Sequence, residues 1–390
     1  MKKLLEYFQH SGLFVLYMLG FLLTFRIALP NYIHSSFISG LFGEGALGIV
    51  YALCAVVGLT AFSLSTRLLR RFGNYRLISV LVVVDICALL GMALFTNPYI
   101  AVFSFAVSYG ATLLMGLCMD VFVEHHSTNI DTGRIRSIYL TSLNLAWLAA
   151  PYLATTLVDG ASFKNVYLLA TVLLLPALLV IRKNLKGFIN PEYPEFSFWG
   201  TIKEVWGRKD VEYIITSYFL LQCFYVAMVI YTPLYLHEYI GFDWMTIGRI
   251  FVIMLLPFIF IQIPLGQIAD KYIGEKEMLN IGFIIMAIST MTIPFVDGAH
   301  FWVWAGILFA TRVGAAAVEV MTDTYFYKNI SEKNVNIISL YKSMIPLASL
   351  VVAGVSSIFL LFFPIQYVFF LTGFLMLFAL RFGLAIHDTK

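Results

Sequence analysis

Long, almost uninterrupted apolar blocks constrain the fold of this chain more than any other feature of its sequence. Each block is close to the roughly 20 residues that a helix needs to cross a hydrocarbon core. Only helices and closed barrels satisfy their backbone in lipid, and the blocks lack the alternation of barrel strands. We therefore predict an all-α polytopic membrane protein. About twelve blocks are present, over residues 12–37, 46–66, 77–96, 99–123, 137–158, 166–182, 213–236, 246–267, 278–296, 300–320, 336–361 and 364–386.

Composition agrees with a bilayer environment and argues against several classes of function. The chain is 61% hydrophobic and 12% charged, whereas about a quarter of the residues of a soluble domain are charged. Its formal charge of +3 is too small to indicate a nucleic-acid partner. The blocks hold no cluster of nucleophiles or metal ligands, so we expect no enzyme, no cofactor and no metal. Four single cysteines are expected in the core, without disulfides: Cys54, Cys87, Cys118 and Cys223.

The basic residues predict the orientation of the chain in its membrane. With the N-terminus inside, the inner segments hold nearly all the Lys and Arg residues that lie outside the blocks, and the outer loops hold only Lys164. This bias places both termini in the cytoplasm under the positive-inside rule. We expect an integral protein of the plasma membrane that contacts membrane lipid, and nothing in the sequence demands more than a monomer.

An internal repeat predicts two halves of six helices each. A shift of 200 residues aligns Gly48 with Gly248 and Asn129-Ile130 with Asn329-Ile330. An even number of helices leaves both copies in the same orientation, and such halves place a substrate site at their interface near the midplane. The expected organisation is a six-helix bundle over 1–181, a cytoplasmic linker over 182–211 and a second six-helix bundle over 212–390.

The linker carries apolar residues at the spacing of one helix face. Phe198, Ile202, Val205 and Trp206 favour a short amphipathic helix on the inner leaflet, where the basic residues of the linker can meet anionic lipid. The alternative is a flexible tether with incidental aromatic residues.

One charged loop interrupts the apolar blocks of the second copy. It reads GQIADKYIGEK from Gly266 and contains Asp270, Lys271 and Gly274. It resembles the signature loop of the major facilitator superfamily, in which a glycine, an aspartate and basic residues recur at this position. The resemblance implies a latch between alternating-access states, and the alternative is a plain topology anchor.

The resemblance extends over essentially the whole chain through helix count, topology, repeat and linker. In the first copy the corresponding loop has Thr66 in place of the glycine and Arg70 in place of the aspartate, so the two halves are not expected to lock alike. The family resemblance implies a twelve-helix fold of two pseudo-symmetric bundles. It also implies that helices 1, 4, 7 and 10 line a central cavity.

Two arginines lie near the middle of expected membrane helices, where a charge costs about 2.5–3.5 kcal/mol on insertion scales. Arg26 is in helix 1, and two interpretations stay open: a substrate ligand, or a structural pair with an acid of the same half. Arg312 is in helix 10, within FATRVGAAAVE, which resembles an arginine signature that the family usually carries in helix 4 and ties to proton coupling. The two side chains are candidates for a clamp on an anionic solute.

Four further charged residues are candidates for proton coupling or gating. Asp85, in helix 3, is either a proton carrier or a fixed counter-ion, with the counter-ion favoured. Glu319 and Asp323 follow Arg312 along one face of helix 10. Lys342, at similar depth in helix 11, is expected to pair with Glu319, either as a breakable inner gate or as a static bridge.

Several polar residues are weaker candidates. Tyr109, Asn144 and Gln222 are expected either to contact substrate or to pack in the core. The neighbouring residues Asp120, Glu124, His125 and His126 are expected at a solvated helix end, because adjacent histidines point to different faces of a helix and cannot share a metal.

These features together favour a secondary active transporter that moves a small solute by alternating access. We expect an anionic or zwitterionic solute and coupling to protons. A multidrug/proton exporter is the first alternative, favoured by the many aromatic and Met residues, although helix 5 lacks the glycine-rich antiporter pattern. A non-transporting membrane sensor with the same fold is the second.

Overall fold

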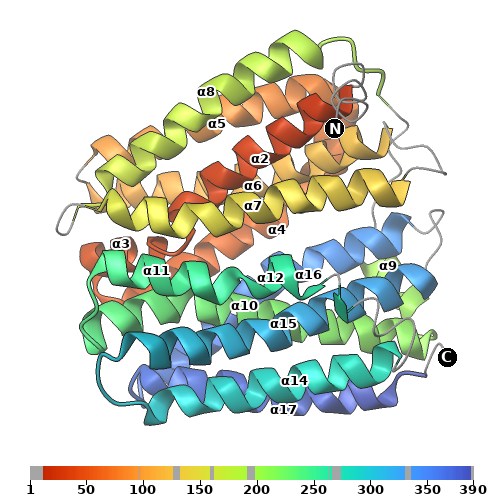
Figure 1. Ribbon diagram of the computed structural model, residues 1–390. Helices are drawn as coiled ribbons and strands as arrows, with labels where there is room; N and C mark the ends of the chain where they lie inside the picture. The colour runs from red at the N-terminus through yellow and green to blue at the C-terminus, as the bar shows by residue number, and fades with distance from the viewer. Residues whose placement is uncertain are drawn as a thin grey trace, which may run out of the picture. The chain divides into compact units, whose positions relative to one another are not determined.

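Helices joined by short connections make up the computed structural model (Figure 1), which describes residues 12–95, 97–125, 132–158, 162–190, 198–262, 264–265, 274–329 and 335–387. Contacts divide the chain into two compact units. Unit 1 comprises Met1–Ile33 and Val56–Glu195, and unit 2 comprises His34–Ala55 and Phe196–Lys390.

Unit 1 is a helical bundle. In it α2 packs against α7 and α8, and α5 packs against α6 and α8. The helix α4 continues past the expected end at residue 66, because the arginines of its last turns are good helix formers and favour the negative end of the helix dipole. The helices of unit 1 are α2 (Gly12–Asn31), the larger part of α4 (Leu47–Phe72), α5 (Asn74–Leu94), α6 (Pro98–His125), α7 (Thr132–Thr156) and α8 (Lys164–Asn184).

Unit 2 contains a second helical bundle. In it α14 lies between α15 and α17, and α10 packs against α15, α16 and α17 (Figure 1). Its elements are α3 (His34–Phe42), η1 (Glu44–Ala46), the start of α4, α9 (Phe198–Val205), α10 (Lys209–Leu234), the π-helical turn η2 (Tyr235–Tyr239), α11 (Trp244–Leu255), α12 (Pro257–Phe260), α14 (Glu275–Thr292), η4 (Ile293–Phe295), α15 (Phe301–Asn329), α16 (Val335–Phe359) and α17 (Gln366–Ala385).

The segment His34–Ala55 belongs to unit 2 because of its side-chain and backbone contacts. Tyr239 donates a hydrogen bond from its hydroxyl group to Glu44 Oε2 at 2.8 Å. Gly48 on α4 lies so close to α16 that a Cβ atom there would come within 2.6 Å of the Ala353 carbonyl oxygen. This division follows packing, so it differs from the boundaries that the sequence repeat predicts.

Prolines interrupt two of the helices that the sequence predicts as continuous. The first predicted block, 12–37, is divided where α2 ends at Asn31, directly after Pro30. The block 246–267 is divided at Pro257, because proline lacks the N–H that would bond to the preceding turn. The second interruption lies beside α15, because the short helix α12 that follows it contacts α15.

The described helices fit a membrane by length and composition. Ten of them are long and apolar enough to cross a bilayer, and Trp244–Phe260 is a shorter apolar helix. With the more polar α7, these elements account for the twelve membrane helices that the sequence predicts. The chain is therefore an all-α integral membrane protein.

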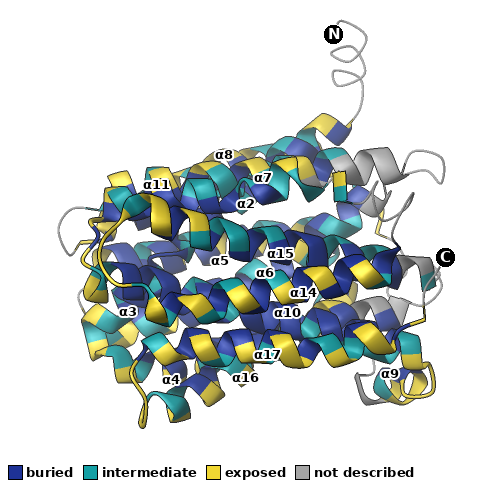
Figure 2. Cartoon of the chain, turned by 60° about the horizontal axis from the view of Figure 1, so that its bottom comes forward, coloured by how far each residue is buried: buried dark blue, intermediate teal, exposed yellow. Residues whose placement is uncertain are grey.

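Exposed apolar side chains cover the outer faces of the bundles. On α14 the relative exposures of Ile281, Ile284 and Ile288 are 44%, 41% and 62%. Exposed and buried residues alternate along α14 and α17 (Figure 2). Such faces would be unfavourable in water and are favourable against lipid chains.

Close approach of α14 and α15 depends on two facing glycines. A Cβ atom added at Gly314 would lie 2.6 Å from the Gly282 carbonyl oxygen, and one added at Gly282 would lie 2.9 Å from the Gly314 carbonyl oxygen. Small residues of this kind let membrane helices pack with their backbones in contact.

We predict that Gly314→Val destabilises the protein by about 1–3 kcal/mol, the usual cost of overpacking. The measurement is the apparent melting temperature of purified protein in detergent. Gly306→Val on the same helix is the matched control, because a Cβ atom there meets nothing within 4 Å. Equal melting temperatures for the two variants would contradict the predicted close contact.

Candidate functional site

A buried ion pair lies inside unit 1. Arg26 on α2 and Asp85 on α5 are 3% and 0% exposed, and Arg26 Nη2 contacts Asp85 Oδ1. Ser108 on α6 accepts a hydrogen bond from Arg26 Nη2 at 2.6 Å and donates one to Asp85 Oδ1 at 2.7 Å. Thr112, one turn further along α6, accepts from Arg26 Nη1 at 2.7 Å. Arg26 is thus held by three side chains of its own unit.

This geometry matches one of the two interpretations that the sequence leaves open for Arg26, the pair with an acid of the same half. Both terminal nitrogens of Arg26 already donate hydrogen bonds. Asp85 is the acid that contacts Arg26 in this geometry, and whether it is a fixed counter-ion or a proton carrier stays a prediction. The remaining buried atoms of the pair, Arg26 Nε and Asp85 Oδ2, have no hydrogen-bond partner within the described ranges.

Arg312 on α15 of unit 2 has different surroundings. Its side chain is 2% exposed, and its guanidinium carbon lies 5.3 Å from the ring centroid of Phe224 and 6.0 Å from that of Tyr225. These distances permit cation–π attraction to both rings of α10. Arg312 Nη1 has no hydrogen-bond partner among the described residues. Arg312 therefore has one buried N–H donor group, at Nη1, that donates no hydrogen bond to a described residue.

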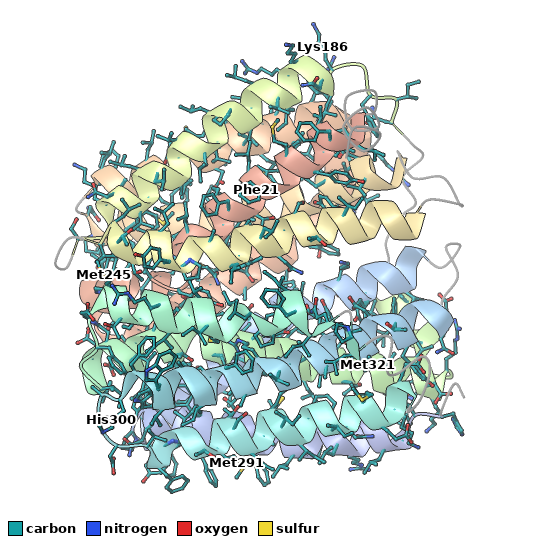
Figure 3. All side chains as sticks on the ribbon, in the orientation of Figure 1. Phe21, Lys186, Met245, Met291, His300 and Met321 are labelled. Carbon is teal, nitrogen blue, oxygen red and sulfur yellow. The ribbon has the colours of Figure 1, made fainter. Side chains whose placement is uncertain are left out.

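Glu319 lies two turns after Arg312 on α15 and is half-buried. Its Oε2 atom accepts hydrogen bonds from the Tyr225 hydroxyl at 3.3 Å and from Gln262 Nε2 at 3.0 Å. Lys342 on α16 is exposed and acts on Glu319 through its charge. Figure 3 labels Met321, two residues after Glu319, on the same helix. The hydrogen-bond donors to Glu319 Oε2 are thus two neutral groups: Tyr225 on α10, and Gln262 in the segment after α12.

Gln262 was not singled out from the sequence. It follows the break at Pro257, where α11 ends and the short helix α12 begins. Interrupted helices beside a polar cluster are typical of substrate sites in transporters built from repeats. The two prolines that flank Gln262, Pro257 and Pro264, are the signal that could have indicated it.

Asp323 is one turn further along α15 and is half-buried. The Tyr341 hydroxyl on α16 donates a hydrogen bond to Asp323 Oδ1. The Tyr341 ring stacks between Tyr218 and Phe326, with centroid distances of 3.9 Å and 4.1 Å. Asp323 is therefore hydrogen-bonded to one member of an aromatic stack formed by α10, α15 and α16. Its hydrogen-bond donor differs from the two donors of Glu319.

The weaker candidates lie on different helices of the two units. Gln222 is 8% exposed on α10, and Asn144 is half-buried on α7 of the other unit. The Tyr109 ring on α6 packs on Gly58 of α4, where a Cβ atom would lie 2.7 Å from it. This contact agrees with the packing role that the sequence left open for Tyr109.

Part of the signature loop lies outside the described residues, namely Gly266, Asp270 and Lys271. Gly274 is described: it has a φ of 99° and directly precedes α14. The side chains of Glu124, His125 and His126 are also outside the described set, while Asp120 is half-buried on α6.

Within the described ranges, no group of three or more His, Cys, Asp or Glu residues could hold a metal ion. Three of the cysteines, Cys54, Cys118 and Cys223, are buried. Cys87 is exposed, so its expected place in the core was wrong: it lies on an outer face of α5.

Comparisons with known proteins agree with this architecture. A crystal structure of a mutant of the nucleoside transporter NupG matches with a TM-score of 0.76 and 12% sequence identity, covering 96% of this chain and 99% of that chain. A search of curated protein sequences found no match. The family model of the Major Facilitator Superfamily matches residues 130–336 and again 246–388, more than half of the chain. The chain therefore belongs to the Major Facilitator Superfamily of membrane transporters.

Proposed function

We propose that the chain is a secondary active transporter that moves a small anionic or zwitterionic solute by alternating access and is coupled to protons. The observation that carries the proposal is the unused donor of Arg312, a fixed positive charge that is 2% exposed. A buried cation is costly unless a partner compensates it. A carboxylate or phosphate of the solute would supply that partner through charge-assisted hydrogen bonds.

Arg312 is a stronger candidate for this role than Arg26. The terminal nitrogens of Arg26 are occupied by Asp85, Ser108 and Thr112 inside unit 1. A ligand would have to displace these partners, which costs more than meeting an unused donor. The solute-binding role that the sequence gave to both arginines is therefore proposed for Arg312 alone.

Glu319 is proposed as the proton-carrying group. It accepts hydrogen bonds from the neutral donors Tyr225 and Gln262, which can remain in place whether the carboxyl group is charged or protonated. Seven residues of helix separate it from Arg312, a rise of about 10 Å. A zwitterionic solute could place its anionic group at Arg312 and its cationic group toward Glu319, so that solute and proton would compete for one carboxylate.

The proposed location is the plasma membrane, with both termini in the cytoplasm. The basic ends of α4 and α8 support this orientation through the positive-inside rule. The linker helix α9 contacts α16 and α10 and leaves Trp206, directly after it, 72% exposed. An aromatic side chain in this position is suited to the headgroup region of the inner leaflet.

The test is solute accumulation by proteoliposomes under pH gradients of either direction. The panel contains carboxylates, zwitterions, cations and apolar drugs, with nucleosides added because the solved relative NupG transports them. Accumulation of an anionic or zwitterionic class that stops when the gradient is collapsed is the expected result. Movement of bulky cations or drugs alone would replace the proposal by an exporter, and binding without movement would replace it by a sensor.

In the same assay we predict that Glu319→Gln abolishes accumulation driven by a pH gradient but retains exchange of solute for solute. The amide preserves size and hydrogen bonding but cannot carry a proton. Glu277→Gln is the control, since this exposed acid lies in the first turn of α14 and is not among the hydrogen-bond partners of Glu319. Gradient-driven accumulation at the wild-type rate in Glu319→Gln would exclude Glu319 as the carrier.

A further inference from the structure

A cavity of about 680 Å³ opens in unit 1 where α4 meets α5, far along the chain from the residues proposed for transport. Four basic residues line it: Arg70, Arg71, Arg76 and Lys186. None of its described lining residues is acidic. Four positive charges around one opening favour occupation by an anion.

The cavity is held in shape by contacts that fix the segment after α8. Asn190 accepts a hydrogen bond from the Asn74 backbone N–H at 2.7 Å, where α5 begins. Gly73, with a φ of 73°, lies so close to Asn190 that a Cβ atom would meet its side-chain amide at 2.7 Å. Phe188 packs edge-on against Phe122 of α6, with ring centroids 4.6 Å apart. These contacts hold the segment carrying Lys186 against the turn between α4 and α5.

The position of the cavity along α4 indicates where its ligand would come from. The candidate membrane-spanning helix that includes α4 ends at Phe72, so Arg70 and Arg71 lie in its last turn, beyond the apolar block. Phe72 is 44% exposed, and the guanidinium carbon of Arg71 lies 5.6 Å from its ring centroid. Basic and aromatic side chains at a span boundary lie at the depth of lipid headgroups. Lys186 lies just beyond the end of α8 (Figure 3).

We propose that this cavity binds a phosphate-bearing anion and that its source is the headgroup of an anionic phospholipid. The arginines would bind the phosphate oxygens through paired N–H groups, which lysine alone cannot do. The site uses neither Arg312 nor Glu319, so its test is independent of the transported solute. The lipid proposal rests only on the location of the chain in a membrane.

The test is native mass spectrometry of delipidated protein titrated with phosphatidylglycerol, and with phosphatidylcholine of the same chain lengths. Wild type should bind phosphatidylglycerol more tightly. The variant Arg70→Gln/Arg71→Gln/Arg76→Gln should bind it on the order of 100-fold more weakly, since each basic residue near an anionic lipid contributes about a fivefold factor.

The matched control is Arg67→Gln/Lys183→Gln/Arg182→Gln, which removes three exposed charges from the same ends of α4 and α8 outside the cavity. It should bind like wild type. Equal weakening in both triple variants would show diffuse attraction to the surface and overturn the site, as would unchanged binding in the cavity variant. If the cavity triple variant does not fold, Lys186→Gln replaces it. This single variant should weaken binding of phosphatidylglycerol about fivefold, and unchanged binding would overturn the site.

Inorganic phosphate distinguishes the source of the anion. It is added as a competitor in the titration and as a sole ligand in a thermal-shift measurement. Weak competition by phosphate against phosphatidylglycerol supports the lipid headgroup. Thermal stabilisation by phosphate that the cavity variant loses, together with no preference for phosphatidylglycerol, would overturn the lipid source in favour of a soluble phosphate.

Discussion

Replacing Arg312 by glutamine is expected to weaken binding of the transported anion by about 30-fold or more and to stop its accumulation. Removing one partner of a buried, hydrogen-bonded charge pair costs about 2–5 kcal/mol, and 1.4 kcal/mol corresponds to a factor of ten in affinity. The measurement is the dissociation constant from ligand-dependent thermal shifts, followed by uptake in proteoliposomes. Arg312→Lys should lose part of the affinity, because an ammonium group keeps the charge without the paired donors.

The stability of the solute-free protein separates binding from folding. Arg312 Nη1 has no partner in the described structure, and the guanidinium carbon lies 5.3 Å from the ring centroid of Phe224 and 6.0 Å from that of Tyr225. Removing a buried charge that forms no ion pair with a described residue relieves a cost, so Arg312→Gln should melt at the same temperature as wild type or higher. Arg381→Gln, which removes an exposed charge from α17, should change neither binding nor stability. Wild-type affinity in Arg312→Gln would remove the basis of the anion proposal.

The membrane helices were predictable because hydropathy alone specifies them. An apolar block of about 20 residues has few alternatives to a helix, since the bilayer offers no water to exposed backbone groups. The ends were less predictable. The apolar block ends at residue 66, whereas α4 extends to Phe72, because arginine-rich turns remain helical outside the apolar region.

The polar clusters depend on packing that the sequence does not express. Arg26 and Asp85 were each identified as intramembrane charges, but 59 residues separate them, and their pairing needed the arrangement of α2, α5 and α6. Gln262 donates a hydrogen bond to Glu319 from the segment that follows the interruption near Pro257, and hydropathy does not predict this contact. Glu319 and Lys342 lie at similar depth along their helices, yet depth alone does not determine the direction in which a side chain points, so their pairing stays a prediction.

The largest loss of stability is expected from Asp85→Asn, about 3–5 kcal/mol. The substitution leaves Arg26, 3% exposed, without its negative partner, and an uncompensated buried charge is strongly destabilising. The measurement is the free energy of unfolding of detergent-purified protein in denaturant. Asp120→Asn, on α6 of the same unit, removes a half-buried carboxylate for which the described residues provide no such partner, and it should cost little.

The double variant Arg26→Met/Asp85→Asn tests the cause of that loss, because it removes both charges of the buried pair. It should recover most of the stability, since replacing both members of such a pair is often close to neutral. Comparison of the two single variants with the double variant, a double-mutant cycle, isolates the coupling energy of the pair.

The same variants decide between the two roles that the sequence left open for Asp85. Lost stability in Asp85→Asn, together with solute transport retained in the double variant, identifies a fixed counter-ion. If Asp85→Asn is instead as stable as wild type but no longer responds to a pH gradient, Asp85 carries the proton and the pair with Arg26 must open during transport. If Asp85 is the fixed counter-ion, Arg312 and Arg26 share one requirement: each buried cation needs a negative partner, supplied by the solute in unit 2 and by the chain itself in unit 1.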